Sequence, residues 1–553
     1  MKHDIDVILF DVGGTLRGAW RQEEEKAMQA LGEINRLMNL NMPENELFRL
    51  LKKGSKGYSA WAQETHMELD EEQLWSRWML PDHPEQLVRS LAMQLNACWR
   101  QIIANREIFP ETQEILMTLF RRGYRLGIVS NTTTSVEVPE FLRRLKLTGM
   151  LECVILSCQY GRRKPDPDIL LEATRRMGVD PLQCAYIGDR LDRDVVAARA
   201  AGFRQIIILD GDRKNNDENL VSDPAQPDLY ISNLLDLKKI FPMKDALPVP
   251  INKYPLSIST MWAIDNFPHL TDFLQASKRI GFEGVELNHQ INSDMLQGTN
   301  LKDGFIASIH EPCPADISAN DLKKRDWLIS SIDEEKRQKG VDSIKRSVFL
   351  ANKIGVKNIV VHCGQIVMDL GLEVQLRALY EKEGAAGESY QILKQHYETE
   401  RERLARAHMD SLKKSIQELL QVAAPLGIRL ALENRYHYFD LPLVDEMEEL
   451  LALAGQDQLG FIYDVGHAQT LDRLGFVPHE EWLRRFSDRM VEIHIHDVKG
   501  IIDHYAPGLG EVDFDMIRPY LPAGIIRTVE IHPRNTPEEL RQGINFLEIK
   551  GII

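Results

Sequence analysis

The sequence LGFIYDVGH, residues 459–467, ends an apolar run on a carboxylate and adds an imidazole three residues later. An apolar run of this length is typical of a buried parallel strand, whose C-terminal end delivers polar side chains to one face of a sheet. Four other apolar runs end on His or Glu in the same way, at residues 359–362, 430–433, 491–494 and 528–530. The sequence therefore predicts that the second half of the chain brings these side chains together.

A strand-then-helix pattern runs from Leu256 towards the C-terminus. The predicted strands are residues 256–260, 284–287, 307–310, 358–362, 429–433, 460–464, 491–494 and 528–530. Eight short strands separated by helical segments predict a (β/α)8 TIM barrel over residues 256–553. One long, charged, helix-prone segment, residues 365–415, interrupts the pattern. We expect it to present a solvated helix face, with a lid over the barrel mouth as the alternative.

Acids and histidines mark the ends of these strands, which converge on one face of a barrel. The set is His310, His362, Glu433, Asp464, His467, His494, His504 and Glu530. Imidazole and carboxylate together suit divalent zinc, manganese, iron or cobalt. A single histidine at a strand end is more often structural, and for His504, which lies on a loop, that reading stays open. The set as a whole favours metal binding.

These residues resemble the xylose isomerase-like barrel superfamily, which includes sugar-phosphate isomerases and epimerases as well as endonuclease IV-type enzymes. The resemblance spans about residues 256–540 and rests on HEP at 310–312, HCG at 362–364, ENR at 433–435, DVGH at 464–467, HIHD at 494–497, GLGE at 508–511, and Glu530. It implies a central metal held by Glu433, Asp464, His494 and Glu530. In the endonuclease-type enzymes a second metal uses the positions of His310 and His362.

A third metal in those enzymes uses the positions of His467 and His504, with an Asp two residues before the latter. Here that residue is Ile502. Asp503 is adjacent, but side chains alternate along an extended segment, so we expect Asp503 to point elsewhere. The sequence therefore predicts an incomplete third site.

The first half of the chain also alternates strands and helices. Apolar, β-rich runs occur at residues 5–10, 124–129, 153–156, 184–187 and 205–209. This alternation predicts an α/β domain with a doubly wound parallel sheet covered on both faces. A polar, helix-prone segment over about residues 17–104 is predicted to be a helical cap inserted into that domain.

Four motifs follow these strands in order: DVGGT at 11–15, Ser130, Lys164, and Asp189 with Asp194. Their order resembles the haloacid dehalogenase-like (HAD) superfamily over residues 1–240. The resemblance implies that Asp11 attacks phosphorus to form an aspartyl-phosphate. Ser130 and Lys164 would hold the phosphoryl oxygens. Asp11, the Gly13 carbonyl and Asp189 would bind Mg²⁺, with Asp194 orienting the metal site.

Gly13 departs from the family's pattern. The phosphatases of the family carry an Asp there, which protonates the leaving group, and general acid catalysis is typically worth about 10²–10⁴-fold. Glycine cannot supply that proton. Two readings stay open: an active hydrolase, with an unusual leaving group, and a weakened or structural domain.

Composition limits the partners. The 553-residue chain has a net charge of −16, and residues 256–553 hold 33 Lys and Arg against 46 Asp and Glu. An acidic surface gives no electrostatic reason to bind nucleic acid or an anionic membrane. No apolar window reaches membrane-spanning length, and the six cysteines include no C-x-x-C pair. We expect a cytoplasmic protein with a small-molecule substrate; a homo-oligomer stays open.

The domains are predicted to meet in a proline-rich connector at residues 241–255, which contains four prolines. The leading hypothesis is a bifunctional enzyme, a HAD-type phosphatase fused to a divalent-metal isomerase or epimerase acting on a sugar or phosphorylated metabolite. In the barrel, Glu433 or Glu530 would move the proton. The alternatives are a barrel that acts as a multinuclear-metal hydrolase on a phosphoester or amide, and a non-catalytic assembly or regulatory protein.

Overall fold

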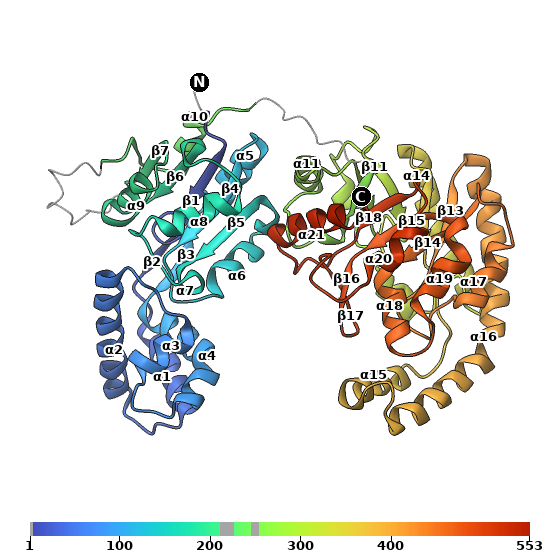
Figure 1. Cartoon of the computed structure of the whole chain (residues 1–553), viewed down its shortest axis with the longest axis horizontal. Helices are drawn as coiled ribbons and strands as arrows, with labels where there is room; N and C mark the ends of the chain where they lie inside the picture. Colours follow the sequence, from blue (N-terminus) through green and yellow to red (C-terminus); the bar gives the residue numbers. More distant parts are fainter. Residues whose placement is uncertain (1–3, 211–225, 245–253) are drawn as a thin grey trace. The chain divides into compact units, whose positions relative to one another are not determined.

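The computed structural model describes residues 4–210, 226–244 and 254–553. The chain divides into two compact units, Met1–Ala246 and Leu247–Ile553 (Figure 1). Most of the predicted connector at 241–255, namely residues 245–253, lies outside the described residues. Within the described ranges, no helix has the length and apolar character needed to cross a bilayer.

A parallel sheet forms the core of the first unit. Over residues 4–210 and 226–244 it has six strands in the order β5–β4–β1–β6–β7–β8. The strands are β1 (Val7–Phe10), β4 (Arg125–Ser130), β5 (Leu151–Leu156), β6 (Cys184–Gly188), β7 (Gln205–Leu209) and β8 (Leu229–Ile231). Five of them follow the predicted runs. We did not predict β8, because its three residues are shorter than the apolar runs by which a strand is recognised in a sequence.

Helices cover this sheet, as its apolar strands require. Every residue of β1 and β6 is buried, which is typical of a parallel strand with both faces covered. The helices are α5 (Thr112–Arg121), α6 (Glu137–Arg144), α7 (Ser157–Tyr160), α8 (Asp168–Arg176), α9 (Val196–Ala200) and α10 (Leu237–Ile240). The α/β fold predicted for this half of the chain is confirmed.

A four-helix cap is inserted between β2 (Arg17–Trp20) and β3 (Asn105–Ile108), which pair antiparallel. Its helices are α1 (Glu24–Met38), α2 (Glu44–Thr65), α3 (Glu71–Leu74) and α4 (Glu85–Ile103). Helix α4 buries Val88, Ala92, Leu95, Trp99 and Ile102, a helical spacing that gives it one apolar face. These side chains pack with those of the other cap helices in a hydrophobic core separate from that of the sheet.

The second unit is a closed barrel of parallel strands. Within residues 254–553 eight strands follow one another around it in the order β9–β10–β11–β12–β13–β14–β15–β18. They are β9 (Leu256–Ser259), β10 (Gly284–Leu287), β11 (Ile306–His310), β12 (Asn358–Val361), β13 (Arg429–Glu433), β14 (Leu459–Asp464), β15 (Met490–Ile495) and β18 (Ile526–Val529). The predicted TIM barrel is confirmed, and each predicted strand agrees within two residues at either end.

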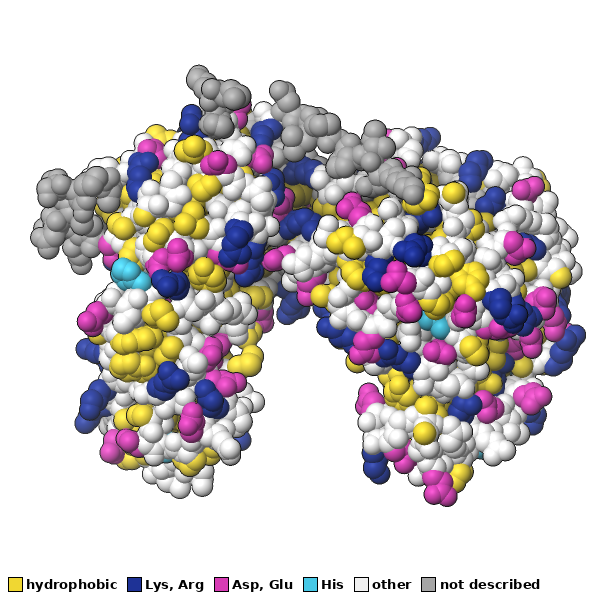
Figure 2. Space-filling model, viewed as in Figure 1, with side chains coloured by type: hydrophobic (Ala, Val, Ile, Leu, Met, Phe, Trp, Pro, Cys, Tyr) yellow, Lys and Arg dark blue, Asp and Glu magenta, His cyan; other side chains and the backbone are white. Residues whose placement is uncertain are grey.

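Helices follow most barrel strands. They are α11 (Leu270–Ile280), α12 (Ser293–Leu296), α13 (Ala319–Lys324), α14 (Glu334–Ile354), α15 (Gly371–Glu383), α16 (Glu388–Ala423), α17 (Val444–Leu451), α18 (Val465–Arg473), α19 (His479–Phe486), α20 (Phe514–Ile517) and α21 (Pro537–Ile549). A hairpin of β16 (Asp497–Lys499) and β17 (Ile502–Tyr505) follows β15. On the face drawn in Figure 2, basic and acidic side chains are interspersed over this unit.

The charged segment 365–415 forms α15 and most of α16, and it is only partly solvated. Glu402 and Arg403 are exposed, as predicted for a solvated helix face. Tyr397 is buried in an aromatic and aliphatic cluster that also holds Phe439 and Ile501, from loops that follow barrel strands. Arg401 is buried too, and its guanidinium donates to both carboxylate oxygens of Glu446 on α17. The segment therefore packs one side against the loops and helix α17 of the barrel unit and exposes the other.

Candidate active sites

The first candidate site lies at the C-terminal end of β1, in the middle of the sheet. Asp11 follows this strand directly and is 3% exposed. The Nζ atom of Lys164 lies 2.7 Å from Asp11 Oδ1 and 2.7 Å from Asp194 Oδ1. One oxygen each from Asp11, Asp189 and Asp194 lies within 4.8 Å of the others. Ser130 ends the neighbouring strand β4 and is also buried. The structure thus brings Asp11, Lys164, Asp189 and Asp194 together, with Ser130 at the end of the adjacent strand.

Electrostatics at this point suit a divalent cation. Burial, together with the charges of Asp11 and Asp194, raises the pKa of Asp189 to about 7. Burial alone would also raise the pKa of Asp194, but Lys164 and Arg193 outweigh it and the pKa is lowered. A cation among these oxygens would hold all three carboxylates ionised. An all-oxygen ligand set of this kind fits Mg²⁺.

Two adjacent glycines shape the nucleophile loop differently. Gly14 has a φ of 90°, and a Cβ atom built there would lie 1.9 Å from Asp189 Oδ2. Only glycine fits this left-handed position. A Cβ atom on Gly13, in contrast, would have no heavy atom within 4 Å. The acid missing at position 13 is therefore not excluded by crowding.

Further residues at this site were not predicted. The amide of Asn131 holds the backbone of Lys164 through two hydrogen bonds, of 2.8 and 2.9 Å. The hydroxyl of Tyr186 accepts from Lys164 Nζ at 2.5 Å. Asp194 accepts from the backbone N–H groups of Asp189 and Arg190 at 3.1 and 3.0 Å, so it fixes the loop that carries Asp189. Tyr186 lies on a predicted strand, but an aromatic residue in an apolar run gives no polar signal.

The second candidate site lies at the C-terminal ends of the barrel strands. Glu433 ends β13, Asp464 ends β14, His494 lies near the end of β15 and Glu530 follows β18. Glu433 Oε1 and Glu530 Oε2 each lie 3.0 Å from His494 Nδ1, and Asp464 Oδ2 lies 3.8 Å from it. All four side chains are buried, and one atom of each lies within 4.8 Å of the others.

The charges of this set fit a bound cation. Burial lowers the pKa of His494, but Glu286 and Glu530 outweigh it, and the pKa is raised well above its ordinary value. Without a metal, a proton on His494 therefore balances the surrounding carboxylates. A divalent ion would supply that positive charge and leave Nδ1 free to bind it. Three carboxylates and one imidazole suit manganese, zinc, iron or cobalt.

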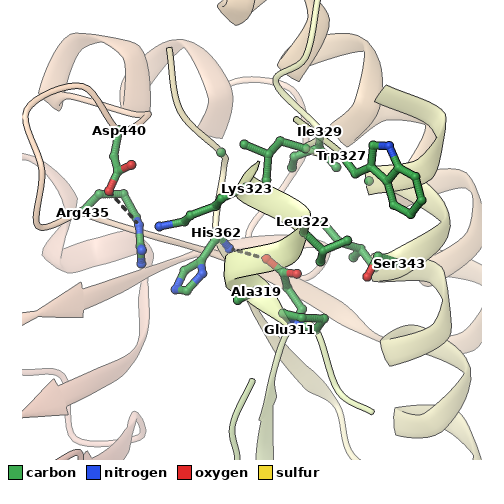
Figure 3. A pocket seen from close by; sticks show the side chains of 15 residues that line it. Glu311, Ala319, Leu322, Lys323, Trp327, Ile329, Ser343, His362, Arg435 and Asp440 are labelled. Carbon is green, nitrogen blue, oxygen red and sulfur yellow. Dashed lines mark hydrogen bonds and ion pairs between the residues drawn. The ribbon is translucent and has the colours of Figure 1, made fainter. Parts of the chain in front are cut away.

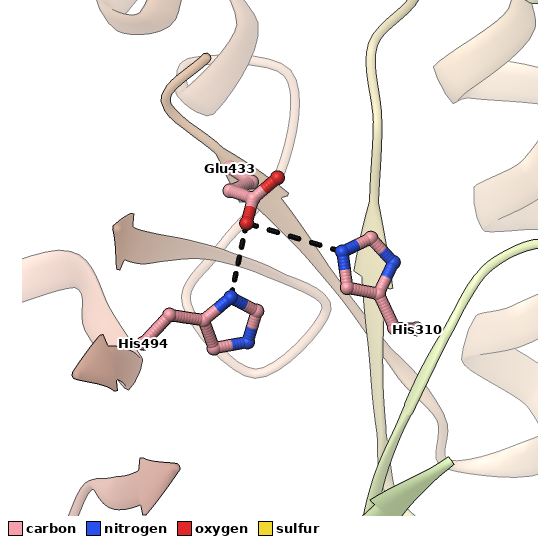
Figure 4. A group of neighbouring side chains, drawn as sticks. All are labelled: His310, Glu433 and His494. Atoms are coloured by element: carbon pink, nitrogen blue, oxygen red, sulfur yellow. Dashed lines mark hydrogen bonds and ion pairs between the residues drawn. The ribbon is translucent and has the colours of Figure 1, made fainter. Parts of the chain in front are cut away.

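His310 and His362 border the same carboxylate. His362 Nε2 lies 3.1 Å from Glu433 Oε2, and His310 Nε2 lies 3.9 Å from Glu433 Oε1. The two imidazole rings are 4.3 Å apart between centroids. Figure 4 shows His310 and His494 directed at the Glu433 carboxylate from different strands. The structure therefore brings these histidines next to the central set.

Asp503 completes a third group, and our expectation that it would point elsewhere is wrong. Its Oδ2 atom lies 3.9 Å from His467 Nε2 and 3.7 Å from His504 Nε2. The expectation assumed the regular alternation of an extended strand. His504 has a φ of 57°, which breaks that alternation and turns both side chains to the same side. Ile502, at the position that the resemblance assigned to an Asp, is half exposed.

Several buried residues around the barrel site were not predicted. His496 Nε2 lies 3.0 Å from Asp464 Oδ1, and His496 Nδ1 accepts from the backbone N–H of His504 at 2.8 Å. The i, i+2 spacing of His494 and His496 could have indicated a shared direction. Arg435 is buried and donates to Glu433 Oε2. Its position two residues after Glu433 could likewise have been noted.

A small cavity of about 40 Å³ opens beside His362. Figure 3 shows the side chains of Lys323, His362 and Arg435 converging there. Glu311, on the same wall, accepts from the backbone N–H of His362 at 3.0 Å. Burial raises the pKa of Glu311 to about 7. The small cavity next to the metal ligands is therefore lined by charges of both signs, Lys323 and Arg435 against Glu311 and Asp440, with apolar side chains between them.

Comparison with known proteins separates the two units. Residues 5–202 match the haloacid dehalogenase-like hydrolase family, and residues 274–550 match the family of xylose isomerase-like TIM barrels. The chain is 31% identical over 234 residues to a glyceraldehyde 3-phosphate phosphatase of Methanopyrus kandleri, covering 42% of this chain and 95% of that protein. It is 31% identical over 219 residues to a phosphoglycolate phosphatase of Xanthomonas campestris pv. campestris, covering 38% of this chain and 87% of that protein.

Among solved structures, a D-tagatose 3-epimerase-like protein aligns with a TM-score of 0.36 and 17% identity, covering 54% of this chain and 98% of that one. The family matches agree with the fold of each unit, a parallel sheet with helices and a closed barrel. The chain therefore belongs to the haloacid dehalogenase-like hydrolases through its first unit and to the xylose isomerase-like TIM barrels through its second.

Proposed function

We propose that this protein is an enzyme with two active sites, a phosphatase in the first unit and a divalent-metal isomerase or epimerase of a sugar or sugar phosphate in the second. One observation carries the barrel assignment: four buried side chains from four strand ends place their ligand atoms within 4.8 Å of one another. They are Glu433, Asp464, His494 and Glu530. Few structural roles require three buried carboxylates to face one another, because their charges repel.

In the barrel, the bound metal would polarise a carbonyl and an adjacent hydroxyl of the substrate. Glu433 and Glu530 are the candidates for moving the proton at the neighbouring carbon. Burial alone would raise the pKa of both, but Arg435 lowers that of Glu433 and His494 lowers that of Glu530, in each case well below the ordinary value. In the protein without a metal both are therefore ionised, as a metal ligand or a general base must be.

The cavity beside His362 supports an anionic substrate. Lys323 and Arg435 line it, and Trp327 supplies an aromatic wall. A guanidinium is suited to bidentate recognition of phosphate or carboxylate. Asp440 Oδ2 lies 3.8 Å from Arg435 Nε and acts on the guanidinium through its charge. Lys323 and Arg435 are thus candidates for contact with an anionic group at the edge of the substrate, while Arg435 also pairs with Glu433 and the carboxylates of Glu311 and Asp440 share the lining.

In the first unit, Asp11 would attack the phosphorus of a small phosphate monoester. Lys164 and Ser130 would hold the phosphoryl oxygens, and Asp194 would keep the metal-binding loop in place. The two similar proteins named above are phosphatases of glyceraldehyde 3-phosphate and of phosphoglycolate, which supports a small phosphorylated substrate here. Because Gly13 supplies no proton, we expect a preference for leaving groups that need little protonation.

A second candidate for the barrel is a multinuclear-metal hydrolase. It is favoured by two further groups beside the central set: His310 with Glu433 and His494, and His467 with Asp503 and His504. If each group binds an ion, the barrel would resemble a trinuclear centre that activates water. The acidic composition of residues 256–553 opposes a nucleic-acid substrate but not a small phosphoester or amide.

Isotope transfer separates the two candidates. The full chain carrying Asp11→Asn, which disables the proposed phosphatase site so that ¹⁸O can report on the barrel, is incubated with a panel of sugars and sugar phosphates, once in D₂O and once in H₂¹⁸O. An isomerase or epimerase transfers protons at carbon, so solvent deuterium enters a C–H position, which NMR detects. A hydrolase introduces ¹⁸O into a product, which mass spectrometry detects. Glu433→Gln is the matched control, because it removes one metal ligand while keeping the shape of the side chain.

A further inference from the structure

Three arginines from separate segments meet on one carboxylate where the cap joins the core of the first unit. Arg17 lies on β2, Arg100 near the end of α4 and Arg106 on β3, while Glu137 begins α6. Arg17 Nη2 and Arg100 Nη2 each lie 2.8 Å from Glu137 Oε2, and Arg100 Nε donates to Glu137 Oε1 at 2.9 Å. One carboxylate serves three guanidinium groups, so the cluster carries an excess of positive charge.

Arg106 is the least well neutralised of the three. Its Nη1 atom donates to the carbonyl oxygens of Arg100 and Ala104, at 2.7 and 3.3 Å. Its Nε atom, however, lies 4.0 Å from Glu137 Oε2, beyond hydrogen-bond distance. The side chain is 16% exposed, so water compensates its charge only in part. Burial, followed by the charge of Arg100, lowers the pKa of Arg106 to about 10 against the opposing effect of Glu137.

A cavity of about 340 Å³ opens beside this cluster. Four arginines and two carboxylates line it: Arg17, Arg100, Arg106 and Arg144 with Glu137 and Glu140. None of the predicted catalytic residues Asp11, Ser130 and Lys164 lines it, so it is distinct from the phosphatase site. Since a water molecule takes about 30 Å³ in the liquid, the cavity has room for a small anion and several waters.

We propose that this cavity binds a compact dianion, a phosphate group or a small dicarboxylate, and that the bound dianion ties the cap to the core. Guanidinium groups bind both chemistries through paired N–H donors. A dianion would neutralise the excess charge that Glu137 leaves. Its partners would come from both strands that lead into and out of the cap, from cap helix α4 and from core helix α6.

Arg17 couples this cavity to the nucleophile loop. The carbonyl oxygen of Arg17 accepts from the backbone N–H of Gly14 at 2.8 Å, and its own N–H donates to Val12 at 3.1 Å. Burial lowers the pKa of Arg17, and the negative charges of Glu137 and Asp11 oppose that effect, so Asp11 acts on this guanidinium. A ligand that holds Arg17 and Arg106 would therefore favour one position of the cap and change turnover at Asp11, by about 5-fold or more for a typical allosteric coupling.

Calorimetric titration of the full chain tests this, with inorganic phosphate and malonate as separate probes. Arg106→Ala should weaken binding at least about 10-fold. Arg106→Lys keeps the charge but loses the paired donors, so its affinity should lie between those of the wild type and Arg106→Ala. Glu137→Gln should tighten binding, because it removes the competing carboxylate. The control is Arg36→Ala on cap helix α1, whose guanidinium pairs with Glu33 at the exposed surface; it should bind like the wild type.

The opposite signs expected for Arg106→Ala and Glu137→Gln separate binding from structural damage. If both variants bind the probes as the wild type does, the cluster is a structural ion-pair network and the proposal is wrong. If both substitutions weaken binding equally, damage to the structure where the cap joins the core explains the result and the proposal is again wrong. A preference for phosphate over malonate, or the reverse, identifies the ligand class. Inorganic phosphate can also bind at the phosphatase site, so the malonate titration and the difference between wild type and Arg106→Ala are the readouts that report on the arginine cavity.

Discussion

The Nε2 atom of His494 lies 3.1 Å from Glu286 Oε2, so the imidazole that faces the metal ligands through Nδ1 is held from behind by a buried carboxylate. Glu286 lies on β10 and is fully buried. Ser308 donates to the same oxygen at 3.2 Å. A carboxylate on the second nitrogen of a metal-binding histidine fixes the tautomer and the ring direction.

Glu286→Gln should therefore lower metal affinity about 10–100-fold, the usual cost of losing such a partner. Glutamine keeps the volume of the side chain but cannot hold the ring with a full negative charge. Metal titration of the apo protein with a competing chelator measures the change. Glu335→Gln, at an exposed position on α14, is the control and should leave the affinity unchanged. Equal metal affinities in the wild type, Glu286→Gln and Glu335→Gln would show that Glu286 does not support the metal site.

Gly13→Asp should raise the turnover of alkyl phosphates. The empty space around the Gly13 Cβ position accepts the side chain, and a general acid is typically worth about 10²–10⁴-fold. p-Nitrophenyl phosphate should respond less, because its leaving group needs little protonation. Gly13→Asn, which has the same shape without the acid, serves as the comparison. Wild-type rates that are already fast and equal on both substrates, and abolished by Asp11→Asn, would contradict this account of the missing acid.

Glu137 should make the stability of the first unit depend on acid pH. Burial alone would raise its pKa, but its arginine partners, Arg100 first, lower it to about 2. A carboxyl group whose pKa is lower in the folded state than in the unfolded state stabilises the folded protein. That stabilisation is complete above the unfolded-state pKa of about 4.3, and it is lost as the pH falls through the folded-state pKa of about 2. Glu137→Gln should thus cost on the order of 2 kcal/mol at pH 7, and the difference should shrink between pH 4 and 2.

Urea titrations of wild type and Glu137→Gln at pH 7 and pH 3, followed through the unfolding of the first unit, measure this difference. Glu25→Gln, at an exposed position on cap helix α1, is the matched control for loss of a surface carboxylate. A difference that stays constant across this range would mean that Glu137 is not held ionised by the arginines.

Sequence alone was sufficient where the signal is local. Each barrel strand is a short apolar run, and the ligand set lies at strand ends, so both could be predicted from position. Asp503 could not, because a single positive φ at His504 reverses the direction that strand alternation assigns. Glu286 sits inside a strand without a flanking motif, and on sequence grounds it resembles a solvent-facing residue.

The arginine cluster where the cap joins the core was not predicted, for a different reason. Arg17, Arg100 and Glu137 are far apart in the chain, and charged residues at such positions are usually solvated. Their proximity arises only when the cap folds back between β2 and β3. Ser130 and Lys164, by contrast, could be assigned to one site from the sequence because their order resembles the motifs of the haloacid dehalogenase-like superfamily.

Metal content of purified ligand variants tests the central claim most directly. Asp464→Asn removes a charged ligand but keeps the hydrogen bond that caps α18 at the N–H of His467, since Asn caps as well as Asp. The variant also loses the charge that pairs with buried His496, so the apo protein should stay folded but unfold more easily than the wild type. Elemental analysis should find that Asp464→Asn, like Glu433→Gln, has lost the tightly bound metal, while His467→Ala and His504→Ala retain it. If His504→Ala strips the metal as completely as Glu433→Gln does, the groups form one coupled cluster, and the hydrolase assignment replaces the isomerase assignment.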